Sequence, residues 1–318
     1  MKKIIFIFLV TAFSFGAETI WEQNLSKYFN NQSFSGIHYF AFNTVDNNTE
    51  TTYKFNVRRN YLTFKNKLND YINFRITYDV YQNDDGDWDN SLKYAYIYFK
   101  KVLPYTDLEI GQAHTTWIDY EKKSSWKYDL ASRVFLDDRS GANLLASADL
   151  GFKLITNLDY FSSAVGVYDG EGQNRNSEGK GLSVEARLTY HILGNSYKKD
   201  YLNLSVLGNN NNNNELESSN NSNVYGVHLV YKNDFVILSV QYIDSKVQNE
   251  ASKDGYSFSG DYSINKNLNL FGMYSSFEDT KTRLAGLSYK INQNINTVAM
   301  FKNYSSIDEY HLGLQLKW

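Results

Sequence analysis

The sequence predicts an all-β protein: a transmembrane, antiparallel, up-and-down β-barrel of sixteen strands. Apolar and polar residues alternate with period two almost everywhere after residue 33, which is the pattern of strands that have two different faces. The 318 residues contain one proline, Pro104, and 16% aromatic residues. Aromatic residues favour strands and form the interfacial girdles of membrane barrels. Short and long connections then alternate along the chain, as periplasmic turns and outer loops do.

Sixteen segments show the alternation, and each has about the length of a tilted membrane-spanning strand, which needs ~9–11 residues. They are residues 34–45, 51–65, 70–82, 91–103, 105–117, 146–157, 159–169, 180–193, 200–208, 223–232, 234–246, 255–264, 268–277, 281–291, 294–303 and 308–318. Fourteen and eighteen strands are the alternative counts.

The connections between these segments fall into two sets. The tight ones are residues 66–69, 103–104, 157–158, 232–234, 265–267 and 292–294. The longer ones are residues 82–90, 118–145, 170–179, 209–222 and 245–254. With an even strand count, both chain ends lie in the periplasm and every longer connection lies outside. The run of asparagines that begins at Asn209 has nothing apolar to bury, which predicts a mobile surface loop over 209–222.

The first residues predict export. Lys2 and Lys3 precede an apolar stretch that ends in small residues, and this is the pattern of a secretory signal peptide over residues 1–17. Residues 18–32 then form a short periplasmic segment, and residues 33–318 form the barrel. The predicted location is the outer membrane of a Gram-negative cell, where lipid and lipopolysaccharide surround the protein. The chain has no cysteine and a formal net charge of −3, so we expect neither a thiolate metal site nor a nucleic-acid partner.

A barrel of sixteen strands leaves a water-filled lumen, whereas eight strands are filled by side chains. The inward phase here is polar and includes Arg58, Arg75, Lys153, Glu185 and Arg187. An arginine or lysine on the lipid face at mid-membrane costs roughly 2–4 kcal/mol, so this phase is informative. The sequence therefore predicts a channel for passive diffusion of small hydrophilic solutes.

Two neighbouring arginines, Arg58 and Arg59, interrupt the alternation in the second segment. Neighbours on a strand point to opposite faces, so one of the two would face lipid. We assign Arg58 to the lumen. Arg59 either turns inward at a β-bulge or packs in a subunit interface, and the change in apolar phase from Leu62 onward favours the bulge.

The longest connection, residues 118–145, mixes both signs of charge with aromatic residues. Its candidate pore-lining residues are Asp119, Glu121, Arg133, Asp137, Asp138 and Arg139. A loop of this length is usually functional or disordered. We predict that it folds into the lumen, narrows it and sets a local field, as charged rings do in other pores. A solvated outer loop is the alternative.

The last segment ends the chain with an apolar row on one face. The row consists of Tyr310, Leu312, Leu314, Leu316 and Trp318. Its period predicts a lipid-facing surface on the strand that closes the barrel.

A family resemblance follows from four motifs. Residues 53–65 (YKFNVRRNYLTFK), Ala95-Tyr96, Ile110-Gly111-Gln112 and Ala148-Asp149-Leu150-Gly151 occur in the order found in the phosphate-selective porin O and P type. The similarity is best over residues 33–190. It implies a homotrimeric, sixteen-stranded porin, either general or anion-preferring, in which Arg58, Arg59 and residues 119–139 line the constriction. It also implies that the C-terminal row serves as the insertion signal.

The chain departs from that family in its arginines. It has only eight of them, and no strand carries several inward arginines in succession. Selectivity for phosphate is therefore not expected.

Three other classes of protein are the alternatives. An outer-membrane hydrolase would need a triad, and its best candidate is His114 with Asp119 and Ser124, but no catalytic spacing surrounds them. We therefore expect no enzyme, no cofactor and no metal. A barrel acting mainly as an adhesin or structural surface protein is the alternative function, because the outer loops are long and polar. A soluble exported β-protein is the third.

Overall fold

The computed structural model describes residues 31–83, 85–173, 181–194, 200–213 and 222–318. The predicted signal peptide and nearly all of the predicted periplasmic segment lie outside these residues. Among the described residues, no helix has the length and hydrophobicity needed to cross a membrane.

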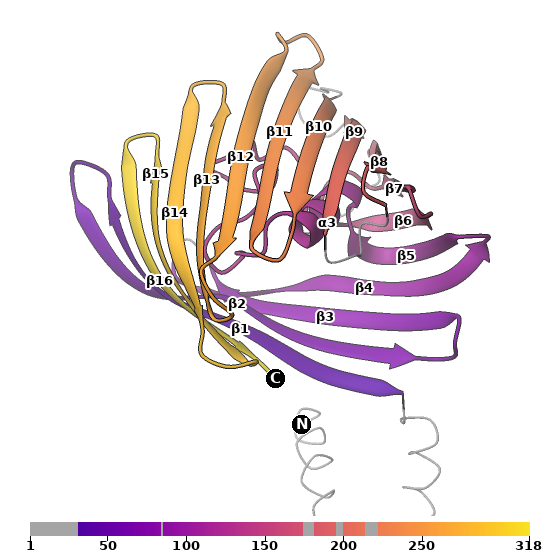
Figure 1. The fold of residues 1–318 in the computed structure, drawn as a ribbon, viewed down its shortest axis with the longest axis horizontal. Coiled ribbons are helices and arrows are strands. Elements are labelled where there is room, and N and C mark those ends of the chain that lie inside the picture. The colour runs from indigo at the N-terminus through magenta and orange to yellow at the C-terminus, as the bar shows by residue number, and fades with distance from the viewer. Residues whose placement is uncertain (1–30, 84, 174–180, 195–199, 214–221) are drawn as a thin grey trace, which may run out of the picture.

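The strands close into one antiparallel barrel in which each pairs with its neighbours in sequence and β1 pairs with β16 (Figure 1). The strands are β1 (Gln32–Asp46), β2 (Thr51–Lys67), β3 (Ile72–Gln82), β4 (Trp88–Leu103), β5 (Thr106–His114), β6 (Ala148–Asn157), β7 (Phe161–Tyr168), β8 (Gly181–His191), β9 (Tyr201–Asn213), β10 (Ser222–Lys232), β11 (Val236–Val247), β12 (Lys253–Ser263), β13 (Leu268–Phe277), β14 (Thr280–Lys290), β15 (Ile295–Tyr304) and β16 (Ile307–Lys317). The predicted fold class and the count of sixteen strands are confirmed.

The two faces of the wall follow the predicted phases. On β8, Leu182, Val184 and Leu188 are exposed on the outside, whereas Glu185 and Arg187 are buried inside. An apolar exterior and a polar interior are expected for a wall that faces lipid on its outside and water on its inside.

The tight turns lie at the end of the barrel where β1 begins and β16 ends, called here the turn end, and the longer connections lie at the loop end. Four tight turns share one device. The side-chain oxygens of Asn69, Asn233, Asn265 and Asn292 each accept from the backbone N–H groups two and three residues later. Asparagine therefore recurs in these turns because it completes their hydrogen bonds.

Two β-bulges change which residues point inward. The pairing of β1 with β2 shifts so that Arg59 lies opposite Tyr39 and Val57 opposite Phe40, which leaves Arg58 as the extra residue. The pairing of β3 with β4 shifts in the same way and leaves Lys93 extra. The bulge predicted at the double arginine is confirmed, and it brings a second basic side chain to the inner face.

Two expected boundaries are corrected. β5 ends at His114 rather than at residue 117, and the helix α3 (Thr116–Ser124) follows it, so the constriction loop, L3, comprises residues 115–147. The run Asn209–Asn213, expected in a mobile loop, belongs to β9. It pairs along its length with β8, and Asn209–Asn211 also pair with β10. Strands pair through their backbone N–H and C=O groups, so a run of asparagines continues a strand where an adjacent strand extends beside it. The rest of that expected loop, residues 214–221, lies outside the described residues.

Candidate functional site

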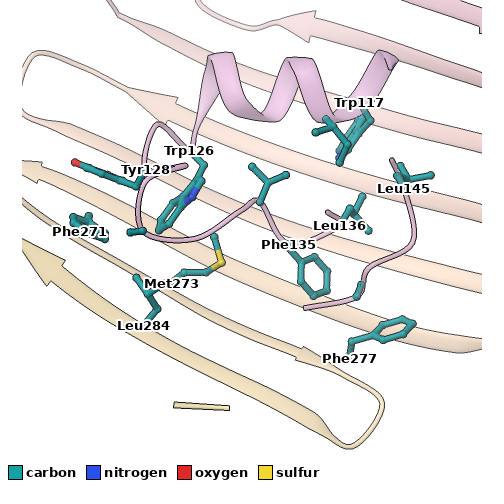
Figure 2. Close-up of a cluster of buried hydrophobic side chains, with 14 of the residues drawn as sticks. Trp117, Trp126, Tyr128, Phe135, Leu136, Leu145, Phe271, Met273, Phe277 and Leu284 are labelled. Carbon is teal, nitrogen blue, oxygen red and sulfur yellow. The ribbon is translucent and has the colours of Figure 1, made fainter. Parts of the chain in front are cut away.

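L3 runs inside the barrel, where α3 lies within the ring of strands (Figure 1). Its apolar side chains pack on the wall around Trp126, Tyr128 and Phe135 (Figure 2). The ring of Tyr128 stacks on Phe271 of β13 at 3.8 Å between centroids. The wall supplies inward-facing Leu207, Val224, Ile243, Phe271, Met273, Leu284, Val298 and Met300. Burial of this surface holds the loop in the lumen.

This apolar part of the inner wall was not predicted from the sequence. A signal was present, because in the run Val298-Ala299-Met300-Phe301 both phases of β15 are apolar. Val298 and Met300 are buried under L3, while Phe301 is exposed on the lipid face. A membrane strand with two apolar faces therefore indicates a segment that packs inside the barrel.

Polar contacts attach L3 to other parts of the wall. The Arg58 guanidinium donates to the carbonyl oxygens of Leu130 and Ala131, at 3.0 and 2.8 Å. The backbone N–H of Trp117, at the start of α3, donates to Glu185 Oε1 at 2.5 Å. A carboxylate beside the first turn of a helix satisfies an otherwise unpaired N–H group and complements the helix dipole. L3 is thus held from β2 and from β8.

Buried carboxyl groups of L3 differ in their protonation. The Glu121 side chain lies against Gln241 of β11, whose amide, oriented to satisfy both neighbours, donates to Glu121 Oε1 at 3.2 Å and accepts from Trp117 Nε1 at 2.8 Å. Burial, together with the nearby Asp137 carboxylate, raises the pKa of Glu121 to about 8.

Asp138 shows the opposite behaviour. Burial opposes its ionisation, but the Lys302 ammonium group, 3.2 Å away, and the hydroxyls of Ser132 and Ser140 outweigh that effect. They hold the pKa of Asp138 well below its usual range. Of these two carboxyl groups, Asp138 is therefore charged and Glu121 is neutral at pH 7.

A cavity of about 570 Å³ lies at the loop end, between L3 and the wall of β1–β4. Its basic lining residues are Lys54, Arg58, Arg59, Arg133, Arg139 and Lys302, and its acidic ones are Asp79, Asp89 and Asp138. Among the described residues this loop-end cavity thus has an excess of three positive charges.

A second cavity of about 470 Å³, the helix cavity, lies between α3 and the wall of β4–β10 toward the turn end. Its charged residues are Lys123, Lys153, Arg187 and Lys232 against Glu109 and Asp119. A third, the turn-end cavity, holds Lys127, Lys266, Lys290 and Lys317 against Asp234. All three cavities have more basic than acidic lining residues, although the whole chain has a net charge of −3.

The predicted site residues divide into two groups. Those that line a cavity are Arg58, Arg59, Arg133, Asp138 and Arg139 at the loop end, and Asp119, Lys153 and Arg187 in the helix cavity. Those that lie in contacts are Glu121 and Glu185 between L3 and the wall, Asp137 beside Lys122 and Arg133, and Arg75 against the ring of Tyr94.

Three lysines that were not predicted from the sequence also line these cavities: Lys54, Lys302 and Lys232. The phase of β15 marks Lys302, because it is two residues beyond Met300 on the inner face. Lys232 ends β10, so its place beside α3 follows only from where L3 lies.

The triad candidate is held in other contacts. The ring of His114 stacks on Tyr94 at 4.0 Å, and the Asp119 carboxylate accepts from Lys123 at 2.7 Å. Within the described ranges, no group of three His, Cys, Asp or Glu residues is arranged to hold a metal ion.

The comparisons with known proteins agree with this architecture. The family described as "Phosphate-selective porin O and P" matches residues 32–271. Comparison with curated proteins finds no match.

Solved structures of outer-membrane proteins share the fold. OmpF of Salmonella typhi, in complex with daunomycin, has a TM-score of 0.69 at 12% identity, covering 91% of this chain and 98% of that one. In-vitro folded OmpT of Vibrio cholerae, in its trimer form, has a TM-score of 0.66 at 14% identity, covering 90% and 99%. A mutant porin of Rh. blastica has a TM-score of 0.64 at 12% identity, covering 90% and 100%.

Proposed function

Because this chain belongs to the phosphate-selective porin O and P family, we propose that it is an anion-preferring channel whose selectivity is set by the basic cavities on either side of L3. As a porin of this family it lies in the outer membrane and allows passive diffusion of small hydrophilic solutes through its lumen. The comparisons give no support to the alternative of an adhesin.

The charge of the cavities carries the proposal. A solute that enters from the loop end meets the excess of positive charge around Arg58 and Arg59. It meets an excess of positive charge again in the helix cavity and in the turn-end cavity. Low-dielectric walls focus the field of such charges into the pore, and lumen charges act on permeating ions more than distant surface charges do. The acidic residues that give the whole chain its net negative charge lie mostly outside these cavities, so they affect ion selectivity less.

Anion preference does not require phosphate specificity. In the loop-end cavity Arg58 donates to two L3 carbonyls, Arg59 donates to the Tyr61 hydroxyl, and Arg133 lies 3.5 Å from Asp137. Guanidinium groups engaged in this way offer fewer donors for bidentate binding of a phosphate. We therefore expect phosphate to permeate with other small anions instead of being bound tightly.

The experiment is the reversal potential of single channels in a planar bilayer under a salt gradient. We expect a reversal potential of the sign for anion flux, and Arg58→Gln shifts it toward zero. Lys246→Gln also removes one positive charge, from an exposed position of β11 outside the lumen, and leaves the reversal potential unchanged. A cation-selective wild-type channel, or equal shifts in the two variants, contradicts the proposal.

We also propose that the porin is a homotrimer, in which the outer surface of β1, β2 and β13–β16 faces a second copy. OmpT, which shares the fold, has a trimer form. That surface contains an apolar hollow of about 640 Å³ lined by Phe40, Phe42, Phe55, Leu287, Leu312 and Leu314. Detergent-solubilised protein that runs as a monomer before heating would contradict this. The remaining exposed apolar band then contacts lipid, and the outer rim contacts lipopolysaccharide.

A further inference from the structure

We propose that the helix cavity is a binding site for small organic carboxylates that carry a ring or a short hydrocarbon body. This inference rests on the anion preference proposed above and adds a recognition step on the turn-end side of L3. The cavity combines a lysine with no ion-pair partner among the described residues and an unsatisfied buried amide group with aromatic and aliphatic surface for a carbon body.

Two pairs of charges in the cavity neutralise each other. The Lys153 ammonium lies 2.8 Å from Glu109, and the Lys123 ammonium lies 2.7 Å from Asp119. Of the other two bases, Arg187 donates to the hydroxyls of Ser162 and Thr189. Within the described chain no carboxylate lies at ion-pair distance from Lys232. Lys232 therefore offers its positive charge to a ligand.

Each of the two bases is held over a tyrosine ring. The Arg187 guanidinium carbon lies 4.4 Å from the ring centre of Tyr120, and Lys232 Nζ lies 5.5 Å from that of Tyr201. Both rings are fixed by their hydroxyls, since Tyr120 accepts from Ser205 and Tyr201 donates to the Ser124 carbonyl. The ring of Tyr201 thus positions Lys232 without neutralising its charge.

A buried donor in the wall of the cavity supplies an independent indication. Asn203 is fully buried and lines the cavity, and its side-chain oxygen is bonded to His191 Nδ1 at 2.9 Å. Its amide nitrogen has no acceptor among the described residues. A buried donor without a partner is costly, and an anionic oxygen in the cavity satisfies it.

The rest of the lining favours an organic anion over inorganic phosphate. Ile155, Ala164 and the ring of Tyr98 add apolar surface to the tyrosines already described. A volume of about 470 Å³ accommodates a one-ring carboxylate, and pockets of this size bind small molecules through apolar walls and a few placed polar groups. Inorganic phosphate has no carbon body to cover that apolar surface, which then stays in contact with water.

The test uses the chloride current of the whole channel with benzoate, acetate or inorganic phosphate added from the turn-end side. We expect benzoate to reduce the current at lower concentration than either of the other two anions. Lys232→Gln raises the half-blocking benzoate concentration by about tenfold, as the loss of one charge-assisted contact predicts. Lys232→Arg restores block.

The matched control is Lys290→Gln, which removes a lysine from the turn-end cavity and leaves benzoate block unchanged. Equal block by benzoate and acetate overturns the recognition of a carbon body. If Lys232→Gln and Lys290→Gln change benzoate block equally, the site is overturned, because the effect then comes from the summed charge of the lumen. Failure of the proposed function is seen separately, as a wild-type reversal potential without anion preference.

Discussion

The indole ring of Trp318 lies over Gly36 at the seam where the barrel closes. The backbones of the two residues exchange N–H···O bonds of 3.0 and 3.1 Å, and Trp318 Nε1 donates to His38 Nε2 at 2.8 Å. A Cβ atom on Gly36 would lie 2.5 Å from the indole ring. The indole of Trp318 therefore packs on the backbone of β1 at Gly36, where no side chain projects, and this contact joins β16 to β1.

Gly36→Ala is expected to weaken this closure, because the indole has to move away from a methyl group. Overpacking of this kind costs about 1–3 kcal/mol. The variant should unfold at lower temperature in a heat-modifiability assay on detergent gels. Gly260→Ala is the control, since its Cβ meets its nearest neighbour at 3.4 Å. Equal unfolding temperatures of the two variants would show that the ring does not hold the seam.

Phe271→Ala should release L3 without opening the barrel. Its ring stacks on Tyr128 and contacts Trp126, so truncation leaves a cavity under the loop. Large-to-small changes at a packed aromatic cost about 3–5 kcal/mol. Limited proteolysis should cut within residues 115–147 faster, and single-channel current should become noisier. Leu270→Ala, on the lipid face of the same strand, should change neither. Cleavage of both variants at the same rate would mean that the packing is not what holds L3.

Arg58→Met removes the donor to the Leu130 and Ala131 carbonyls while keeping much of the side-chain volume. Two buried carbonyls then lose a charged partner, at a cost of about 1.5–3 kcal/mol for each bond. We expect larger fluctuations of the open-channel current as well as weaker anion selectivity. Arg75→Met, whose guanidinium packs on Tyr94, should leave the fluctuations unchanged. Steady current in the Arg58 variant would separate this arginine from loop anchoring.

The L3–wall contact should weaken at alkaline pH through Glu121. Burial raises the pKa of Glu121 from 4.5 to about 8, so the folded protein binds a proton that the unfolded chain releases. The stability of the contact therefore falls as pH rises from about 4.5, and the whole loss is present above about 8. The groups facing Glu121 are Lys122, Asp137, Trp117 and Gln241.

Protease accessibility of L3 at pH 6 and pH 9 measures this effect. The wild-type loop should be cut faster at pH 9, and Glu121→Gln should remove the difference. Asp119→Asn is the control, because Lys123 and other nearby cations hold the pKa of Asp119 below its usual range and it does not titrate in this window. A pH difference that survives in the Glu121 variant would place the titrating group elsewhere.

The sequence by itself determined the barrel, because a strand between lipid and water needs alternating faces, and that alternation is visible residue by residue in segments such as β8 and β16. It also predicted the bulge at Arg58 and Arg59, since a charged side chain on the lipid face is expensive. The inward fold of L3 was predicted from its length and composition.

Only the tertiary structure decided what L3 packs against and which charges share a cavity. Arg58 of β2, Arg139 of L3 and Lys302 of β15 line one cavity, although Arg139 and Lys302 are 163 positions apart along the chain. Glu121 and Glu185, both predicted to line the pore, lie instead where L3 contacts the wall. Local periodicity assigns each residue to the inner or outer face of its strand. Which inward side chains of distant segments lie close together depends on closure of the barrel and on the apolar packing that places L3 across the lumen.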